Sequence, residues 1–524
     1  MKKRIILFLS VAFIAFSAFS QQNKAVNSEL QKQGELDWSN ENYKLSVSSY
    51  EKLIKASPEN VEFCYRFGIA NFLAGFEPEK SLKALEPLIG KTDAPNDVSY
   101  WIGQLYMNIY QFADAIDMFN TYIASPGVSQ LRIAETKRLI EMCESAIELM
   151  NKPVNVSFEN LGPNINSSSN DFNPFVPENE EFLVFSSDKK FDLDAKMFDQ
   201  NMYISFPEKS GWAIAHTTTL INTPDNEKTV GLSADGKKLF VCGNFAKLYS
   251  DVYTAILKGK QFKFDPAENC INGLGNKLTT GATIPADNSV IYFSAVRDDS
   301  KGEGDIYYIR LLPNGQWGKP KGISDAINTP YDEIYPSVSP DGKTLYFSSK
   351  GHNSMGGYDL FVSYLNEING DWTKPINIGY PINTPGDNFI ISFSKDRRYA
   401  YTSLIRKEGL GGHDIYRVTF KDVDEPITLM KGKIKIKDGT NISEWNKENN
   451  YLDISVFDSH QNLFGKYIYN GNLKRFVSAL PAGEYKLVIS ADGFQEYSET
   501  ISILEHGLFQ PEIEKEFLLL LKKQ

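Results

Sequence analysis

Acidic residues, replaced by asparagine in the first unit of each series, recur at a near-constant spacing in the middle of the chain, and carboxylates in such a pattern could hold a cation or serve as acid and base. One series comprises Asn201, Asp251, Asp305, Asp359 and Asp414. A second series comprises Asn179, Asp235, Asp287, Asp341 and Asp396. An Asp at a turn before a strand also accepts backbone N–H groups. Because a residue needed in every repeat usually supports the fold, we favour this architectural interpretation over a ring of carboxylates around a channel.

Other residues that could carry chemistry do not form a recognisable site. Asp298–Asp305, DDSKGEGD, is acidic like a calcium loop but lacks the Asp-x-Asp-x-Asp-Gly spacing and the distant glutamate. There is no His-Glu-x-x-His pair among the histidines, which are His216, His352, His413, His460 and His506. A Gly-x-Ser-x-Gly elbow is absent, and nothing nominates two carboxylates for glycosidic chemistry. We expect no catalytic, metal or cofactor-binding residues, and a protein that is not an enzyme.

The four cysteines are widely spaced and form no Cys-x-x-Cys pair, so neither a zinc site nor a disulfide scaffold is expected. Cys64 and Cys143 occupy apolar positions of predicted helices and are expected to be small core residues. Cys242 and Cys270 could pair across a sheet in an oxidising compartment. The sequence leaves that pairing open.

The repeated carboxylates belong to units that must position them. Each unit in residues 151–422 holds about four short strands, rich in β-branched and aromatic residues, between Asp-Gly, Asn-Gly and Gly-Gly turns. This pattern is typical of a propeller blade, which buries both faces only between neighbours. The last unit lacks its final strand, whereas Lys152–Val156, KPVNV, precedes the first unit. We predict that this early segment completes the last blade and closes a ring of five blades, with six as the alternative.

Residues 21–150 show helical periodicity instead. Small residues such as Gly68 and Gly103 fall where two helices of a hairpin would cross, and Arg132–Met150 holds a predicted closing helix. These hairpins resemble tetratricopeptide repeats (TPR). The resemblance implies a helical solenoid whose concave surface binds a peptide or a partner helix. We expect the aromatic side chains Tyr65, Trp101 and Tyr106 to be core between helices.

Residues 423–524 alternate apolar and polar positions between turns, which predicts a small β-sandwich. Leu480–Tyr497 resembles the closing hairpin of the carboxypeptidase regulatory-like domain, an Ig-like module. In the middle region, Ser339–Ser349 (SPDGKTLYFSS) and Gly356–Phe361 (GGYDLF) resemble the WD40-like (PD40), TolB-type propeller repeat. The predicted fold is therefore multidomain, with a TPR solenoid, a propeller and a sandwich in that order.

The ends and the charge of the chain bear on its location. Residues 1–20 have a basic start, an apolar run and a small-x-small cleavage site, which predicts a signal peptide and export. No later run reaches the roughly 18 apolar residues of a membrane span, and no Cys follows the cleavage site to carry a lipid. The net charge of -11 argues against nucleic acid or anionic lipid as the main partner. We identify no basic patch in the sequence.

This order of modules behind a signal peptide resembles the PorE-type periplasmic proteins of Bacteroidota, which are associated with type IX secretion and gliding. In that family an OmpA-like domain holds peptidoglycan, and this chain reaches Gln524 without one. Direct peptidoglycan binding is therefore not expected. The resemblance implies a periplasmic, outer-membrane-associated scaffold that binds envelope proteins through the TPR groove and a propeller face.

Two alternatives stay open from the sequence. One is a glycan-binding or glycan-processing envelope protein, in which the propeller channel and rim aromatics such as Tyr335 and Tyr358 hold sugar. The other is a secreted cargo whose sandwich is its export signal. The sequence identifies neither the partner nor the propeller face that binds it.

Overall fold

The computed structural model describes residues 27–522 apart from 193–196, 210, 224–225, 244–250, 265–277, 437–441, 443–450 and 505–507. The predicted signal peptide, Cys270 and His506 lie outside the described residues. The chain divides into two compact units. One comprises Met1–Pro153, Asn353–Gly357 and Asn383–Asp387, and the other comprises Val154–His352, Tyr358–Ile382 and Asn388–Gln524. Within the described residues, no helix has the length and apolar character needed to cross a membrane.

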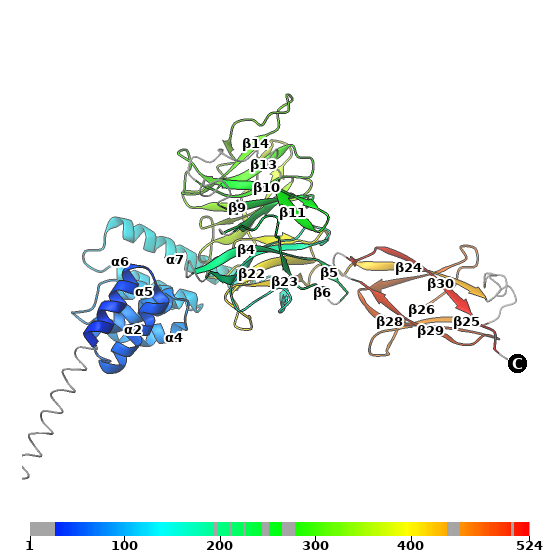
Figure 1. Ribbon diagram of the computed structural model, residues 1–524, viewed down its shortest axis with the longest axis horizontal. Coiled ribbons are helices and arrows are strands. Elements are labelled where there is room, and N and C mark those ends of the chain that lie inside the picture. Colours follow the sequence, from blue (N-terminus) through cyan, green and yellow to red (C-terminus); the bar gives the residue numbers. More distant parts are fainter. Residues whose placement is uncertain are drawn as a thin grey trace, which may run out of the picture. The chain divides into compact units, whose positions relative to one another are not determined.

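The first unit is helical (Figure 1). After a helix over residues 27–39, it contains α2 (Tyr43–Ala56), α3 (Val61–Leu73), α4 (Pro78–Leu85), the 3₁₀ turn η1 (Glu86–Leu88), α5 (Val98–Asn108), α6 (Phe112–Ile123) and α7 (Gln130–Met150). Side-chain oxygens of Asn60 and Ser129 accept the backbone N–H groups of Phe63 and Arg132 and so cap the first turns of α3 and α7. Successive helices pack against each other along the chain.

Glycines set how closely the helices of this unit approach each other. A Cβ atom at Gly68 would lie 2.5 Å from Leu85 Cγ, and one at Gly103 would lie 2.6 Å from Phe119 Cε1. Leu85 and Phe119 are fully buried, so a larger residue at either glycine would push the helix pair apart. The prediction that small residues sit at helix crossings is confirmed at both positions.

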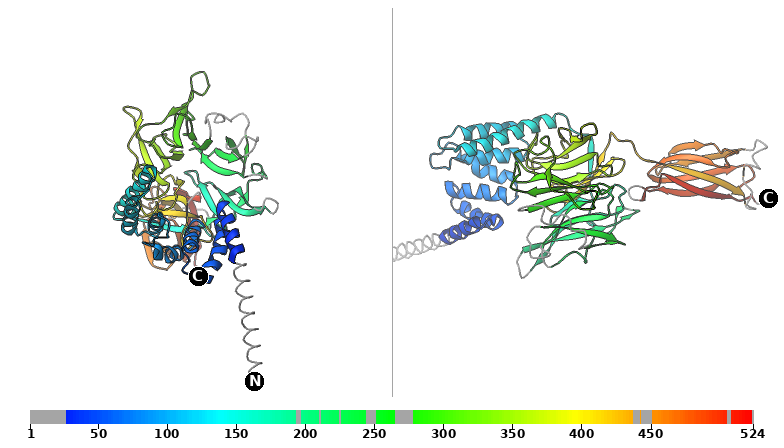
Figure 2. Two further views of the ribbon diagram at one scale, coloured as in Figure 1. Left: turned by 90° about the vertical axis from the view of Figure 1, so that its left-hand side faces the viewer. Right: turned by 90° about the horizontal axis from the view of Figure 1, so that it is seen from above.

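Five antiparallel sheets follow among the described residues, and we number them as blades 1 to 5 (Figures 1 and 2). Blade 1 comprises β2 (Asp171–Phe175), β3 (Leu183–Asp192), β4 (Met197–Ser205) and β7 (His216–Thr217), beside a small hairpin of β5 (Pro207–Glu208) and β6 (Gly211–Trp212). Blade 2 comprises β8 (Lys228–Leu232), β9 (Lys238–Gly243), β10 (Asp251–Lys258) and β11 (Gln261–Phe264). Blade 3 comprises β12 (Leu278–Thr283), β13 (Val290–Val296), β14 (Asp305–Arg310) and β15 (Lys321–Gly322).

The last two blades complete a ring. Blade 4 comprises β16 (Glu333–Val338), β17 (Thr344–Ser349), β18 (Asp359–Asn366), β19 (Asp371–Trp372) and β20 (Ile376–Asn377). Blade 5 comprises β21 (Ile391–Phe393), β22 (Tyr399–Leu404), β23 (Asp414–Phe420) and, from the start of the region, β1 (Val156–Asn160). The pairing of β1 with β23 confirms the predicted closure of a five-bladed propeller. The closing strand begins at Val156, where the predicted segment ends.

Side-chain amides reinforce this closure. Asn166 Nδ2 donates to Ile415 O at 2.9 Å, and Ile415 N donates to Asn166 Oδ1 at 2.8 Å. Asn328 makes the same two bonds with Ile306, at 2.9 and 3.0 Å, between blades that are neighbours in sequence. The amide thus extends a strand edge by one pair of hydrogen bonds. At Asn166 this pair joins residues 249 positions apart.

We expect Asn166→Ala to lower the free energy of unfolding by about 2 kcal/mol, because it leaves the buried N–H of Ile415 without a partner. Denaturant titration measures this change. Hydrogen exchange of the β1 and β23 amides should also accelerate, since the seam of the ring opens locally. The matched variant Asn328→Ala should lose similar stability without affecting exchange in these strands. Unchanged exchange of β23 in Asn166→Ala would contradict this role.

Hydrogen bonds between blades connect the innermost strands around the axis. Asn173 and Thr229 join β2 to β8 through two bonds of 2.9 Å. Thr283 Oγ1 donates to Leu232 O at 3.1 Å, which joins β12 to β8. Ser392 Oγ donates to Pro174 O at 3.1 Å and joins the last blade to the first. These buried polar side chains hold the ring at its centre.

The C-terminal region forms two further sheets (Figure 1). One orders β27 (Phe476–Pro481), β24 (Ile427–Ile436) and β30 (Glu512–Leu519), and the other orders β26 (Leu463–Tyr467), β25 (Leu452–Phe457), β28 (Gly483–Ala491) and β29 (Tyr497–Ile503). A shared apolar core includes Ile434, Ile454 and Phe517. On the outer face, lysines of β24 form ion pairs with glutamates of β30, namely Lys431–Glu512, Lys433–Glu514 and Lys435–Glu516.

Candidate functional site

The second carboxylate series has a structural role. Each member accepts a hydrogen bond from the backbone N–H two residues later, at 3.0 to 3.4 Å, which closes the turn before the central strand of its blade. The members are Asn179, Asp235, Asp287, Asp341 and Asp396. The architectural interpretation of this series is confirmed.

In the first series, Asp305 and Asp414 also accept backbone N–H groups, whereas Asp359 accepts the side-chain amide of Asn377 at 2.8 Å. Asp305 accepts the N–H groups of Lys301 and Gly302 at 2.8 and 3.1 Å. Asp414 accepts those of Leu410 and Gly411. The side chain of Asp251 lies outside the described residues. Within the described ranges no three His, Cys, Asp or Glu side chains gather closely enough to hold a metal ion.

Glu333 is a buried carboxylate that the sequence analysis did not single out. It accepts hydrogen bonds from Thr329 N at 2.8 Å, from Thr329 Oγ1 at 2.7 Å and from Ser349 Oγ at 2.7 Å. These donors favour the charged form. Burial outweighs them, and the nearby Asp305 adds to its effect, so the pKa of Glu333 rises from 4.5 to about 7. These hydrogen bonds hold in place the loop of residues 329–332, which leads into blade 4.

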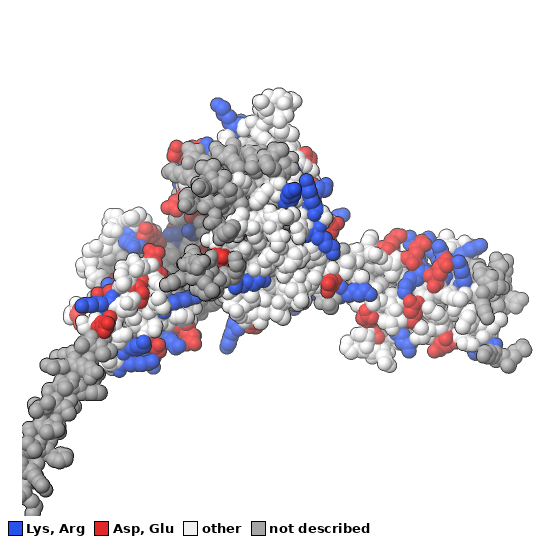
Figure 3. Space-filling view, in the orientation of Figure 1, with Lys and Arg blue, Asp and Glu red and all other residues white. Residues whose placement is uncertain are grey.

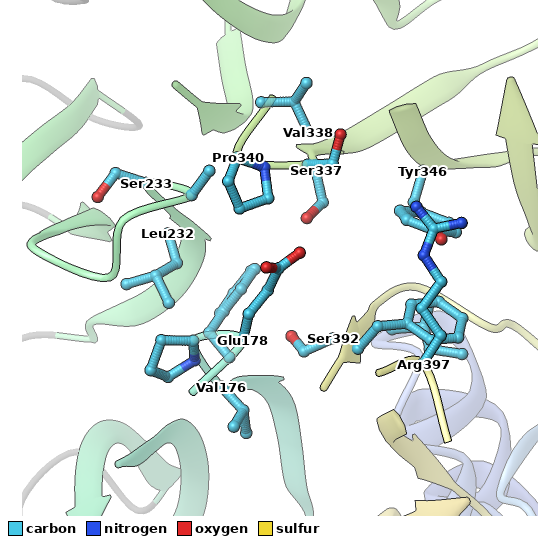
Figure 4. A pocket seen from close by; sticks show the side chains of 16 residues that line it. Val176, Glu178, Leu232, Ser233, Ser337, Val338, Pro340, Tyr346, Ser392 and Arg397 are labelled. Atoms are coloured by element: carbon cyan, nitrogen blue, oxygen red, sulfur yellow. The ribbon is translucent and has the colours of Figure 1, made fainter. Parts of the chain in front are cut away.

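A small cavity lies where the turns of four blades converge on the propeller axis (Figure 4). Its volume is about 60 Å³, enough for a few water molecules. The lining combines apolar side chains with serines and one carboxylate. It includes Val176, Pro177, Glu178, Leu232, Ser233, Ser337, Pro340, Tyr346, Ser392 and Arg397.

Glu178 is the acidic group of this cavity, and Figure 4 shows its carboxylate near the middle of the lining residues. Burial raises the pKa of Glu178, while the positive charge of Arg397 opposes the rise. Burial also raises the pKa of Tyr346 to about 12, so its hydroxyl stays protonated at neutral pH. A glycosidase needs two carboxyl groups about 5 to 9.5 Å apart. The described lining residues supply one, so this cavity does not offer that chemistry.

Tyr335 and Tyr358, the aromatic side chains considered for glycan binding, both contact the ring of Phe389. The ring centroids of Tyr335 and Phe389 are 5.7 Å apart, and those of Tyr358 and Phe389 are 5.3 Å apart. The Tyr358 hydroxyl donates to Asp332 at 2.8 Å, and the Lys350 ammonium lies 4.4 Å from the Tyr358 ring centre. Both tyrosines are half-buried, so their ring faces are largely engaged within the protein.

The remaining candidate residues have structural surroundings. His352 Nε2 lies 3.0 Å from Ile327 O, and the ring packs against Phe361. Cys143 is fully buried, as predicted, and burial raises its pKa to about 12. Cys64 is only half-buried, because it lies near the start of α3. The pairing of Cys242 with Cys270 stays a prediction.

The helical unit carries a larger hollow, which we call the α2–α4 groove. Its volume is about 400 Å³, and it is lined by Val47, Glu51, Phe67, Asn71, Gly75, Phe76, Glu77 and Lys80. Val47 and Phe67 form its apolar floor. Phe76 is 42% exposed at its edge. Ion pairs of Glu77 with Lys80 and of Glu51 with Lys55 border it, at 2.9 and 3.1 Å.

Local backbone bonds place Phe76 at this edge. Gly75 has a φ of +72°, the left-handed conformation that ends a helix. The N–H groups of Gly75 and Phe76 donate to Phe72 O and Asn71 O, at 2.9 and 3.0 Å. The Asn71 amide in turn donates to Glu77 O at 2.9 Å. The exposed ring therefore sits on a fixed turn.

The aromatics Tyr65, Trp101 and Tyr106 do not line this groove. Tyr65 and Trp101 both donate to the Asp97 carboxylate, at 2.8 and 3.1 Å. Tyr106 donates to Glu86 at 2.8 Å. All three are partly buried among the helices, which confirms the core interpretation. No pattern in the sequence indicated that Phe76 would be exposed while these three side chains are partly buried.

Comparisons with known proteins found solved structures that are similar at low identity. No protein-family model and no curated protein matched the chain. Similar solved structures include a TolB protein from Agrobacterium tumefaciens, with 17% identity over 47% of this chain and 73% of that chain and a TM-score of 0.28. They also include a thermostable family-43 glycoside hydrolase (14% identity, 50% of this chain, 94% of that chain, TM-score 0.34).

A structure from an analysis of two prolyl endopeptidases is a third likeness, at 11% identity over 75% of this chain and 52% of that chain, with a TM-score of 0.23. The comparisons do not support the expectation that the chain is not an enzyme, which stays a prediction based on its residues.

Proposed function

We propose that this chain is a non-enzymatic scaffold of the bacterial cell envelope, with a TPR-type helical domain, a TolB-type propeller and an Ig-like sandwich. It acts in the periplasm at the outer membrane, as the resemblance to PorE-type proteins implies. Its partners are proteins of the type IX secretion or gliding machinery. The α2–α4 groove receives an apolar side chain from such a partner.

The observation that carries this proposal is the difference between two hollows. The α2–α4 groove measures about 400 Å³ and has an exposed phenylalanine at its edge, whereas the axial cavity of the propeller measures about 60 Å³. Exposed aromatic rings beside an apolar floor are typical anchors of protein interfaces. A sugar ring needs more room than a few water molecules, so the axial cavity does not favour glycan binding in the channel.

Site-specific photocrosslinking tests this proposal in living cells. A photoreactive phenylalanine analogue at position 76 should capture outer-membrane secretion or gliding proteins. The same analogue at Leu131, which is 69% exposed on α7, serves as the control and should not capture them. Phe76→Ala should weaken the captured interaction about tenfold with little loss of stability, because the ring is exposed. Recovery of the same proteins from both positions, or of none from position 76, would refute the proposal.

A further inference from the structure

Two turns of blade 2 concentrate lysine side chains. The first spans residues 235–238 between β8 and β9, and the second runs from the end of β10 through β11, residues 257–264. Together they contain Lys237, Lys238, Lys258, Lys260 and Lys263. Asp235 is the one acidic residue in these two segments. We call this set of five lysines the blade 2 lysine cluster.

Strand pairing brings the two segments together. Leu257 N donates to Lys237 O at 3.1 Å, which joins the turns directly. Ile256 pairs with Lys238 on one side and with Lys263 on the other, so these two lysines flank the same residue of β10. Figure 3 shows lysine or arginine side chains gathered where Figure 1 labels β10 and β11. The sequence analysis found no basic patch because the two segments are separated along the chain.

Blades 4 and 5 allow a comparison, because each also has a turn before its second strand and a facing segment after its third strand. In blade 4, Lys343 forms an ion pair with Glu367 of the facing turn. In blade 5, Arg398 forms one with Glu425 of the facing segment, at 2.6 Å. Both bases align with Lys237, which instead pairs with Asp235 of its own turn at 3.3 Å. The facing turn of blade 2 has no acidic residue, only further lysines.

Lys258, Lys260 and Lys263 lie within six residues of each other and are exposed, so positive charge is concentrated in this segment. Like charges that lie close together repel each other, and water and salt reduce but do not abolish that repulsion. A bound anion reduces this repulsion and is itself attracted by the three ammonium groups. The whole chain has a net charge of -11, so a local concentration of positive charge contrasts with its acidic character.

We propose that the blade 2 lysine cluster binds an anionic polysaccharide. Lysine ammonium groups act as mobile point charges and suit carboxylates or sulfates spaced irregularly along a flexible polymer. None of the large apolar side chains in the two segments is exposed, so the surface lacks the groups that enter a bilayer or anchor a protein interface. The cluster is separate from the α2–α4 groove and does not depend on the proposed scaffold role.

Binding to immobilised polygalacturonate, measured on the full chain after the predicted signal peptide, tests this inference. The wild type should bind at about 50 mM NaCl and lose affinity at least about tenfold by about 300 mM, because salt screens exposed charges. The triple variant Lys258→Gln, Lys260→Gln and Lys263→Gln should bind about tenfold more weakly. The control variant Lys431→Gln, Lys433→Gln and Lys435→Gln removes the same charge from ion-paired lysines of the sandwich and should bind as the wild type does.

Thermal unfolding checks that both triple variants are folded, since exposed lysines contribute little to stability. Uncharged dextran, polyglutamate and vesicles of phosphatidylglycerol are measured in parallel. Weak binding of all three by the wild type supports the inference. Equal losses in the two triple variants would overturn it, because a general charge effect would then explain the binding. Polyglutamate or vesicle binding as tight as that of polygalacturonate would overturn the assignment to a polysaccharide.

Discussion

Gly231→Ala is expected to lower the free energy of unfolding of the propeller by about 3 kcal/mol or more, which places it among the most damaging single substitutions. A Cβ atom at Gly231 would lie 1.7 Å from Ala282 O and 2.8 Å from Ala282 C. Both contacts are with the backbone of β12, so no side-chain rotation relieves them. The innermost strands β8 and β12 would have to separate, and the hydrogen bond from Thr283 to Leu232 would be lost with them.

Denaturant unfolding followed by tryptophan fluorescence measures this effect. Gly322→Ala is the matched control, because a Cβ atom there would meet only Asn328 Nδ2, at 3.8 Å, in ordinary contact. Its free energy of unfolding should change by less than about 0.5 kcal/mol. A wild-type stability for Gly231→Ala would show that the two strands do not approach so closely.

The second large effect concerns pH and Glu333. Because the pKa of Glu333 is raised to about 7 in the folded protein, the folded state binds a proton more tightly than the unfolded chain, whose value is 4.5. Its contribution to stability is therefore fully present below pH 4.5 and is lost as the pH rises through 7. The loss is on the order of 3 kcal/mol, since one pKa unit corresponds to about 1.4 kcal/mol.

Stability measured at pH 5 and pH 8 in wild type and Glu333→Gln isolates this contribution. The variant should lose the part of the pH dependence that belongs to Glu333. Because glutamine resembles the protonated carboxyl, the two curves should lie closer at pH 5 than at pH 8, where the wild type should be less stable than the variant. Glu303→Gln, at an exposed position of a nearby loop, should leave the wild-type curve unchanged. Parallel curves for wild type and Glu333→Gln would show that the carboxyl is already charged at pH 5.

The blades were predictable because their determinants are local and repeated. Turns such as Asp341–Gly342 recur once per blade and are followed by the most apolar strand, so counting turns gives the number of blades. The closure of the ring was predictable because the last unit lacks its final strand and a matching strand segment precedes the first unit. Gly68 and Gly103 were identified in the same way, from small residues at fixed positions of helix pairs.

The groove and the lysine cluster were not predictable, because both depend on packing that the sequence does not encode locally. Phe76 is one of 34 phenylalanines, and only the turn set by Gly75 exposes its ring. Lys238 and Lys263 come together through the register of β9, β10 and β11, and a shift of one residue would place them on the other face. The burial of Glu333 likewise depends on the loop folded over it.

The pairing of β1 with β23 also dictates an order of assembly. Residues 156–160 emerge early in translation, but their partners at 416–420 follow some 260 residues later, so the last blade stays incomplete until most of the chain exists. The helices of the first unit contact sequence neighbours and can form long before that. Until the seam closes, β1 and β23 expose unpaired edges that invite association between chains. A chain whose ring closes this late would need protection during the interval, and a chaperone that recognises extended strands would provide it.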